Sequence, residues 1–133
     1  MSERPQKFRY VIHRHDASRL HYDLRLEKDG VLKSWAVPKE PPTDYTTKRL
    51  AVAVEDHALD YATFEGVIPE GEYGAGTVEI WDAGTYETEE YEPGAKWVVE
   101  LDGARLKGRY VLVRMKNTGD KHWLFFRAKS AEG

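Results

Sequence analysis

The 133-residue chain contains no cysteine. This absence excludes a disulfide framework, a thiolate-bound metal and a cysteine nucleophile, so any bound metal must have nitrogen and oxygen ligands. The sequence also lacks an apolar run long enough to cross a bilayer, and its N-terminus lacks the apolar segment of a secretory signal. We therefore expect a cytoplasmic protein without a membrane partner.

The sequence has no long stretch of helical periodicity and no internal repeat. Apolar and polar residues alternate over short segments separated by Gly, Asn and Asp turns, a pattern typical of antiparallel strands. Strands are expected at 7–13, 20–27, 31–37, 49–55, 77–81, 85–88, 97–101, 109–115 and 123–128. This spacing predicts a mainly β fold, a compact antiparallel barrel of about eight strands, with a sandwich as the alternative. Short helical turns are expected at 16–20 and 93–96.

No linker or low-complexity segment divides the chain, and its length suits one hydrophobic core. We expect a single domain over 1–133, with flexible tails at 1–6 and 129–133. The four tryptophans fall within expected strands and are assigned to the core. The glycine-rich segment 69–76 lacks the Lys-Ser/Thr ending of a nucleotide-binding loop, so a tight irregular turn is expected there.

Charge is distributed unevenly along the chain. The net charge is −3, but residues 1–49 carry a balance of +4, residues 50–100 carry −12 and residues 101–133 carry +5. Such asymmetry permits a basic surface formed by the two ends of the chain, which would suit nucleic acid. Two solvated faces of opposite sign would give the same pattern, so charge alone does not decide the partner.

The segment HDASRLHYDLRLE, residues 15–27, concentrates polar groups on one face of an expected strand. His21, Asp23 and Arg25 alternate with apolar residues, so all three point to the same side. An imidazole and a carboxylate two residues apart converge readily on one cation, and His15 can reach the same point from the preceding strand. Two imidazoles and one carboxylate suit Mn, Fe or Zn and leave positions open for water or substrate.

Two interpretations of this cluster stay open from the residues alone. An H-x-D pair followed by a distal histidine, here His57, is also the pattern of non-haem iron oxygenases. Phosphate chemistry is favoured by the surplus of groups that bind phosphate, because a guanidinium fork matches a phosphate bidentately. These groups are Arg25, Lys39, Arg49 and His57.

Three long segments resemble the 3′-phosphoesterase module of bacterial DNA ligase D and its stand-alone bacterial and archaeal homologues. They are HDASRLHYDLRLEKDGVLKSWAVPK (15–39), KRLAVAVEDHALDYATFEGVIPEGEYGAGTVEIWD (48–82) and ARLKGRYVLVRMKNTGDKHWL (104–124). The resemblance implies metal ligation by His15, His21 and Asp23, with manganese as the usual metal and Co²⁺ or Zn²⁺ as alternatives. It implies phosphate contacts from Arg25 and His57, with Lys39, Arg49 and Tyr61 in support.

The resemblance leaves two further positions to be interpreted. Glu55 lies in a strongly patterned stretch, and we expect it to orient a metal ligand or an arginine. His13 stands where the family commonly has glutamine, so it is not expected to be a ligand. The loop 43–47 also departs from the family pattern, and such differences concern substrate fit more than the core chemistry.

What the resemblance implies about function is a compact β-barrel hydrolase that processes 3′ ends of DNA in repair by non-homologous end joining. It would remove a terminal ribonucleoside as a phosphodiesterase and then the 3′-phosphate as a phosphomonoesterase, leaving a 3′-hydroxyl. The expected partners are DNA or mixed DNA/RNA ends, a DNA ligase and end-joining factors, and the chain itself is expected to be a monomer. The rival functions are a noncatalytic nucleic-acid-binding barrel and an iron oxygenase.

Overall fold

The structure, a computed structural model, describes residues 7–72, 74–116 and 119–129. These residues form nine strands and one 3₁₀ helix: β1 (Phe8–Asp16), β2 (Leu20–Lys28), β3 (Val31–Val37), β4 (Lys48–Ala58), η1 (Leu59–Thr63), β5 (Gly66–Ile68), β6 (Gly76–Glu92), β7 (Lys96–Gly103), β8 (Lys107–Arg114) and β9 (His122–Arg127). The expected tail 1–6, the end of the expected tail 129–133 and residues 117–118 of an expected turn lie outside the described residues.

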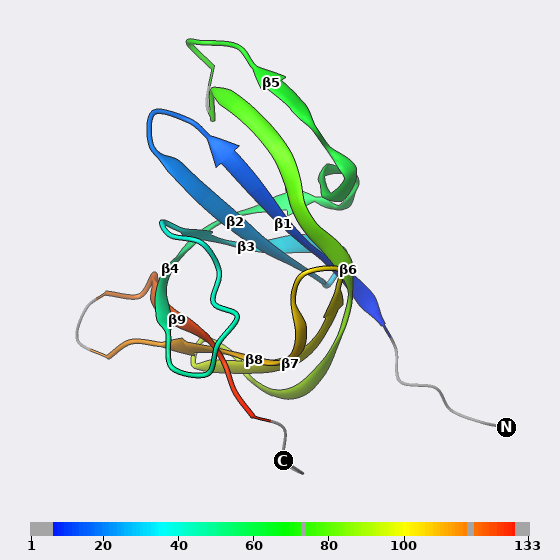
Figure 1. The fold of residues 1–133 in the computed structure, drawn as a ribbon, viewed down its shortest axis with the longest axis vertical. Helices are drawn as coiled ribbons and strands as arrows, with labels where there is room; N and C mark the ends of the chain where they lie inside the picture. The colour runs from blue at the N-terminus through cyan, green and yellow to red at the C-terminus, as the bar shows by residue number, and fades with distance from the viewer. Residues whose placement is uncertain (1–6, 73, 117–118, 130–133) are drawn as a thin grey trace, which may run out of the picture.

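The strands form one antiparallel sheet that closes on itself (Figure 1). Its order is β1-β2-β3-β4-β9-β8-β7-β6, and β6 pairs with β1 to complete an eight-stranded barrel. The short strand β5 pairs only with the beginning of β6, at Gly76–Val78. The prediction of a mainly β antiparallel barrel is therefore confirmed, and closure removes the unpaired edges that an open sheet would expose.

Two of the expected strands, 77–81 and 85–88, are in fact one. The residues between them were interpreted as a turn, but β6 runs through them without a break. Gly84 pairs with Tyr10 on one side and with Gly103 on the other. A Cβ at position 84 would collide with the carbonyl oxygen of Asp102, so this glycine serves a close approach of two strands rather than a turn.

The predicted positions of the helical turns were wrong. Residues 17–19 form a bend and residues 93–95 a turn, while the 3₁₀ helix found in the described residues lies at Leu59–Thr63. Strand β5 was not predicted either. Both missed elements are short and lack a periodic apolar pattern of their own. The helix lies against the outer surfaces of β1, β3 and β4, and this tertiary contact determines its place.

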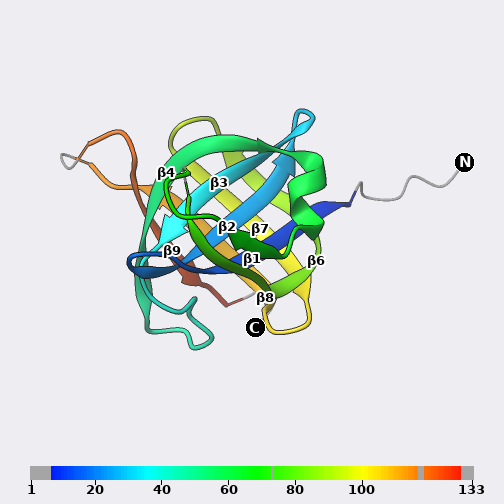
Figure 2. The same ribbon diagram turned by 90° about the horizontal axis from the view of Figure 1, so that it is seen from above.

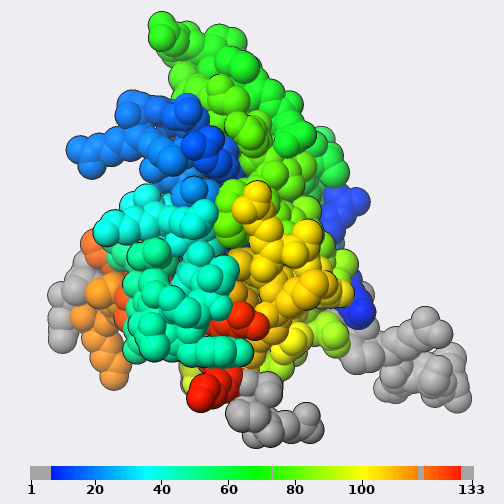
Figure 3. Space-filling view, viewed as in Figure 1, coloured from blue at the N-terminus to red at the C-terminus, as the bar shows by residue number. Residues whose placement is uncertain are grey.

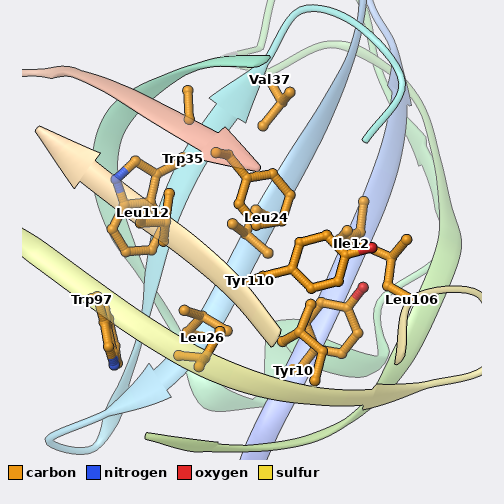
Figure 4. Close-up of a cluster of buried hydrophobic side chains, with 14 of the residues drawn as sticks. Tyr10, Ile12, Leu24, Leu26, Trp35, Val37, Trp97, Leu106, Tyr110 and Leu112 are labelled. Carbon is orange, nitrogen blue, oxygen red and sulfur yellow. The ribbon is translucent and has the colours of Figure 1, made fainter. Parts of the chain in front are cut away.

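The core fills the inside of the barrel with alternate residues of each strand (Figure 4). On β2, for example, Tyr22, Leu24 and Leu26 point inward and are all buried. The assignment of the tryptophans to the core is confirmed for three of them, with Trp81 only half-buried and packed against the cluster. Because neighbouring side chains on a strand point to opposite faces, residues 21, 23 and 25 lie on the outside of the barrel wall.

Beyond β4 the chain crosses this outer face before it re-enters the barrel (Figure 2). The excursion consists of η1, β5 and the loop to β6, and it packs a small apolar cluster against the wall. Buried Val11, Leu32 and Ala62 form this cluster, with Tyr61 and Ile80 against it. The excursion thus covers one side of the polar face of β2. No helix of the described residues is long and apolar enough to span a membrane.

Candidate metal and phosphate site

Pairing of β1 with β2 brings the predicted metal ligands together. Strand β1 extends as far as Asp16, beyond the expected end at residue 13, so His15 lies on it and pairs directly with His21. The next pair on the same face joins His13 with Asp23. Paired residues of antiparallel strands point to the same side. The register alone therefore places two imidazoles and a carboxylate next to one another on the outer face.

The three side chains have the geometry of a cation site. Nδ1 of His15 lies 3.6 Å from Oδ2 of Asp23, and Nε2 of His21 lies 3.4 Å from Oδ1. One ligand atom from each of the three residues falls within 4.8 Å of the others, and they are the one such group among the described residues. These separations suit nitrogen and oxygen ligands about 2.0–2.2 Å from a shared ion.

Backbone carbonyls fix which nitrogen of each histidine faces this point. Nε2 of His15 is 2.8 Å from the carbonyl oxygen of Gly74, and Nδ1 of His21 is 3.1 Å from that of Arg19. A carbonyl only accepts, so each of these nitrogens carries the proton and donates. The opposite nitrogen of each ring faces Asp23, and in the neutral ring that binds a metal it has a lone pair there. Metal-binding histidines are usually oriented in this way, so the donor set fits a divalent metal.

The charges of the site keep Asp23 ionised. Burial on its own raises the pKa of Asp23, but the hydrogen bond with His21 and the charge of Arg25 outweigh it, and the pKa lies below its usual value. The hydrogen bond with Asp23 in turn raises the pKa of His21 against the opposing effect of burial. The site therefore offers an anionic oxygen ligand in a largely buried position.

Arg25 lies beside this cluster and is itself 3% exposed. Its Nε donates to Nδ1 of His13 over 3.0 Å, and its Nη1 donates to Oγ of Ser34 over 2.9 Å. Nη1 also lies 3.2 Å from Nδ1 of His57, and Nη2 donates to Oδ2 of Asp23 over 3.3 Å. Protein acceptors thus engage three of the five N–H groups of the guanidinium, and they engage four when Nδ1 of His57 is unprotonated. One Nη2 N–H has no acceptor among the described residues and is left for a substrate oxygen, so the phosphate contact of Arg25 stays a prediction.

Sequence reasoning missed two residues of this network, Ser34 and His13. His13 is fully buried, and its Nε2 donates to the carbonyl oxygen of Phe64 over 3.1 Å while Nδ1 accepts from Arg25. Burial, together with the charge of Arg25, lowers the pKa of His13 to about 4, so the ring is neutral. The signal that could have revealed it is strand parity, since residues 13 and 15 share a face.

A β-bulge directs His57 into the site. Ser34 pairs with Val54 but Leu32 pairs with His57, so β4 has one residue more than β3 between these pairs. The extra residue turns His57 to the face that carries Arg25, as bulges do when they redirect a side chain. Burial and the charge of Arg25 lower the pKa of His57 from its ordinary value.

His57 is not among the residues that could hold the metal. Its Nδ1 lies 3.2 Å from Nη1 of Arg25 and 3.1 Å from the carbonyl oxygen of Glu55. The interpretation of His57 as the distal ligand of an iron site therefore receives no support. The same geometry shows how residue 55 contacts this histidine, namely through its backbone carbonyl.

Tyr61, from η1, provides the wall opposite β2. Its ring centre lies 4.9 Å from Cζ of Arg25 and 4.9 Å from the ring of His57, and it stacks on Phe64. Burial raises the pKa of Tyr61, so its hydroxyl is protonated and can donate a hydrogen bond. The charged guanidinium thus lies against an aromatic face, which stabilises a partly desolvated cation.

These groups line one cavity of about 400 Å³. Its wall is formed by His15, Ala17, His21, Asp23, Arg25, Ala36, Val54, Glu55, Asp56, His57, Tyr61, Ile68 and Gly74. Seven of the predicted site residues are therefore brought together. Lys39 and Arg49 are not among them, and they line a separate hollow further along β4.

Taken together, the fold and the site define a class of protein, a closed antiparallel barrel that carries a His-His-Asp cluster and a buried arginine on its outer wall. Residues 13–114 match the family model of the DNA ligase D 3′-phosphoesterase domain. The chain belongs to this family, so the resemblance seen in the sequence is confirmed.

Its relatives are much longer proteins. The chain is 53% identical over 124 residues to the multifunctional non-homologous end joining protein LigD of Mycobacterium bovis, which covers 91% of this chain and 16% of the relative. It is 53% identical over 130 residues to the protein of that name from Pseudomonas aeruginosa, covering 93% of this chain and 15% of the relative. The chain therefore corresponds to about one sixth of these proteins.

Proposed function

We propose that the chain is a manganese-dependent phosphoesterase that processes 3′ ends of DNA during non-homologous end joining. The observation that carries this proposal is the position of the buried Arg25, which adjoins the His-His-Asp cluster in one cavity. A cation site alone fits many reactions. A cation site beside a fixed guanidinium and a protonated tyrosine fits a substrate with several anionic oxygens, as a phosphate ester has. Membership of the phosphoesterase family supports the same conclusion.

A divalent ion held by His15, His21 and Asp23 would polarise a phosphate oxygen and lower the pKa of a water. The remaining work falls to the protein's own side chains. The free Nη2 N–H of Arg25 and the hydroxyl of Tyr61 would bind the other phosphoryl oxygens and stabilise the charge that grows on them. His13, Ser34 and Asp23 hold the guanidinium in place, so that it does not reorganise during the reaction.

His57 lines the same cavity and is the candidate proton donor to the leaving group. Its Nδ1 lies beside both Nη1 of Arg25 and the carbonyl oxygen of Glu55, so the proton would be given from Nε2. In the first step a water would attack phosphorus, and the bond to the 5′ oxygen of the terminal nucleoside would break. That oxygen would take a proton from the imidazolium form of His57, and the proton lost by the attacking water would return through solvent to His57. In the second step a further water would release inorganic phosphate and leave a 3′-hydroxyl on the strand.

The test uses a 5′-labelled DNA strand that ends in a single ribonucleotide, incubated with the protein and Mn²⁺. We expect a strand shortened by one nucleoside and ending in 3′-phosphate, followed by the strand ending in 3′-hydroxyl. His21→Ala should abolish both products. Lys107→Ala, which removes an exposed cation paired with Asp102 on the barrel's other side, is the matched control and should retain both.

The outcome also separates the rival functions. A noncatalytic barrel would bind the strand in a salt-dependent manner and leave it unchanged. An iron oxygenase would consume oxygen and a keto acid and would ignore the strand. An unchanged strand in the presence of saturating Mn²⁺, or full activity of His21→Ala, contradicts the proposed function.

A further inference from the structure

The bulge of β4 that turns His57 into the site is built from charged residues. Where the register shifts, β3 contributes one residue, Lys33, and β4 contributes two, Glu55 and Asp56. Both acidic residues line the cavity at the His-His-Asp cluster. A bulge interrupts the ladder of backbone hydrogen bonds and leaves a residue unpaired, so side-chain contacts can decide its conformation. Here a cation on one strand faces two anions on the other.

An ion pair spans this bulge. Nζ of Lys33 donates to Oδ2 of Asp56 over 3.0 Å, and the two side chains are 37% and 43% exposed. An ion pair with this exposure contributes little to the stability of a whole domain. Its effect is therefore local: it fixes which residue of the bulge faces β3.

The conformation of the bulge determines where His57 points, because His57 directly follows Asp56 in the chain. Nδ1 of His57 lies 3.1 Å from the carbonyl oxygen of Glu55, the other residue of the bulge, and 3.2 Å from Nη1 of Arg25. Successive side chains on a strand point to opposite faces, so a shift of the bulge by one residue would turn His57 away from Arg25. The position of His57 thus depends on the register at Asp56.

We propose that Lys33 and Asp56 are positioning residues, whose ion pair fixes the bulge of β4 and so holds His57 where it protonates the leaving group. The inference rests on the proposed function, in which His57 gives its proton from Nε2. Neither residue was singled out by a motif, because the contact joins two strands at an irregularity that has no periodic pattern in the chain.

The chain offers a closely matched control pair. Nζ of Lys96 lies 3.4 Å from Oε2 of Glu90, the two side chains are 38% and 46% exposed, and Glu90 adjoins the bulge of β6. No described residue of β7, which begins at Lys96, lines the cavity. In Figure 3 the yellow to gold segment, which includes the connection from β7 to β8, lies on the surface below the green β5–β6 excursion. Lys96→Ala therefore removes an equally exposed ion pair beside a bulge but leaves the site intact.

The first experiment compares two leaving groups in the presence of Mn²⁺. The strand with a 3′-terminal ribonucleotide releases a nucleoside, whose 5′ oxygen must gain a proton. The p-nitrophenyl ester of thymidine 3′-phosphate reacts with water to give thymidine 3′-phosphate and p-nitrophenolate, which leaves without a proton. We expect Lys33→Ala and Asp56→Ala to lower kcat for nucleoside release about tenfold, part of what a general acid contributes, and to leave kcat on the nitrophenyl ester unchanged. Lys33→Arg keeps the charge and should restore most of the activity, and Lys96→Ala should change neither rate.

A double-mutant comparison shows whether the ion pair acts through His57. Lys33→Ala added to His57→Ala should slow nucleoside release no further, because the residue that the pair positions is already absent. A different role for Lys33, the neutralisation of carboxylates near an anionic substrate, would raise KM for both substrates and would leave Asp56→Ala as active as the wild type. That pattern, or additive losses in the double variant, overturns the proposal.

A second readout needs no turnover. The chain has five histidines, so NMR of the metal-free protein with ¹³C-labelled histidine follows each imidazole separately. We expect Lys33→Ala to shift or broaden the signals of His57 and to leave those of His21 in place, and Lys96→Ala to move neither. Unchanged His57 signals in Lys33→Ala contradict the inference.

The two proposals can fail separately. If the wild-type protein processes neither substrate but its His57 signals respond to Lys33→Ala as expected, the proposed chemistry fails and the positioning of His57 by the ion pair stands. If the wild type processes the strand and Lys33→Ala slows both substrates equally, or neither, the chemistry stands and the positioning role is refuted.

Discussion

Replacement of His13 tests the idea that the guanidinium of Arg25 is held rigid by the protein. The imidazole connects two buried groups, the Nε–H of Arg25 and the carbonyl of Phe64. Leucine has a similar volume and can make neither hydrogen bond, so His13→Leu leaves a charged donor and a carbonyl without partners. Glutamine carries one acceptor and one donor, and His13→Gln can restore both contacts.

The structure sets the scale of the effect. An unsatisfied buried donor or acceptor costs about 1–3 kcal/mol, and more when it is charged, so His13→Leu should lower the free energy of unfolding by about 4 kcal/mol. For a domain of this size that corresponds to a fall in Tm of roughly 15 °C. His13→Gln should cost about 1 kcal/mol, because its flexible side chain loses rotamer freedom when it is fixed.

Urea unfolding at neutral pH measures these differences, and kcat on the 3′-ribonucleotide strand measures the effect on the site. We expect both stability and kcat to fall sharply in His13→Leu and to return largely in His13→Gln. Equal unfolding midpoints for wild type and His13→Leu would refute the reasoning. So would a glutamine variant as damaged as the leucine variant, because hydrogen bonding would then not be what the histidine supplies.

Three other predictions follow from the site and the core. Saturating Mn²⁺ should raise the Tm of the wild type, because a ligand at 100 times its Kd stabilises the folded state by about 2.7 kcal/mol. Differential scanning fluorimetry measures this rise, and it should show none in His21→Ala. Burial raises the pKa of Tyr110 to about 12, so between pH 10 and 12 this phenol ionises only when unfolded, and stability should fall as pH rises. Tyr110→Phe lacks the hydrogen bond to the Pro42 carbonyl, so its free energy of unfolding at pH 8 should be about 1 kcal/mol lower than that of the wild type. In urea titrations its stability should decline less steeply at alkaline pH. Asp82 accepts from the Tyr10 hydroxyl and from the amides of residues 104, 105 and 106, so Asp82→Ala should lower the free energy of unfolding by roughly 4 kcal/mol, measured by urea, with Mn²⁺ affinity retained.

Alternation along a strand was enough to identify the face that carries the site. The two-residue period separates Tyr22 and Leu24 from His21 and Asp23, and this separation depends only on the geometry of an extended chain. The same rule correctly placed the barrel core. It also contained the clue to His13, which shares its face with His15 and was set aside because the family pattern had another residue there.

The sequence did not reveal where separate segments meet. Glu55 was expected to orient a metal ligand or an arginine, and the contact that the structure shows is between its backbone carbonyl and His57, where a bulge in β4 displaces the register by one residue. Bulges, like the 3₁₀ helix that carries Tyr61, depend on contacts between distant strands and leave no periodic trace in the chain.

The amino-acid sequence by itself determined most of the strands, the inward and outward faces and the His-His-Asp set, because these follow from local alternation and residue chemistry. Only the tertiary structure decided how Arg25 is used. Its guanidinium contacts four side chains from four strands, which leaves one Nη2 N–H without an acceptor among the described residues, and no spacing along the chain could show this. Tertiary structure likewise separated Lys39 and Arg49 from the cavity at the His-His-Asp cluster and placed them beside Lys48, because the distance between the two hollows is set by barrel closure and strand register.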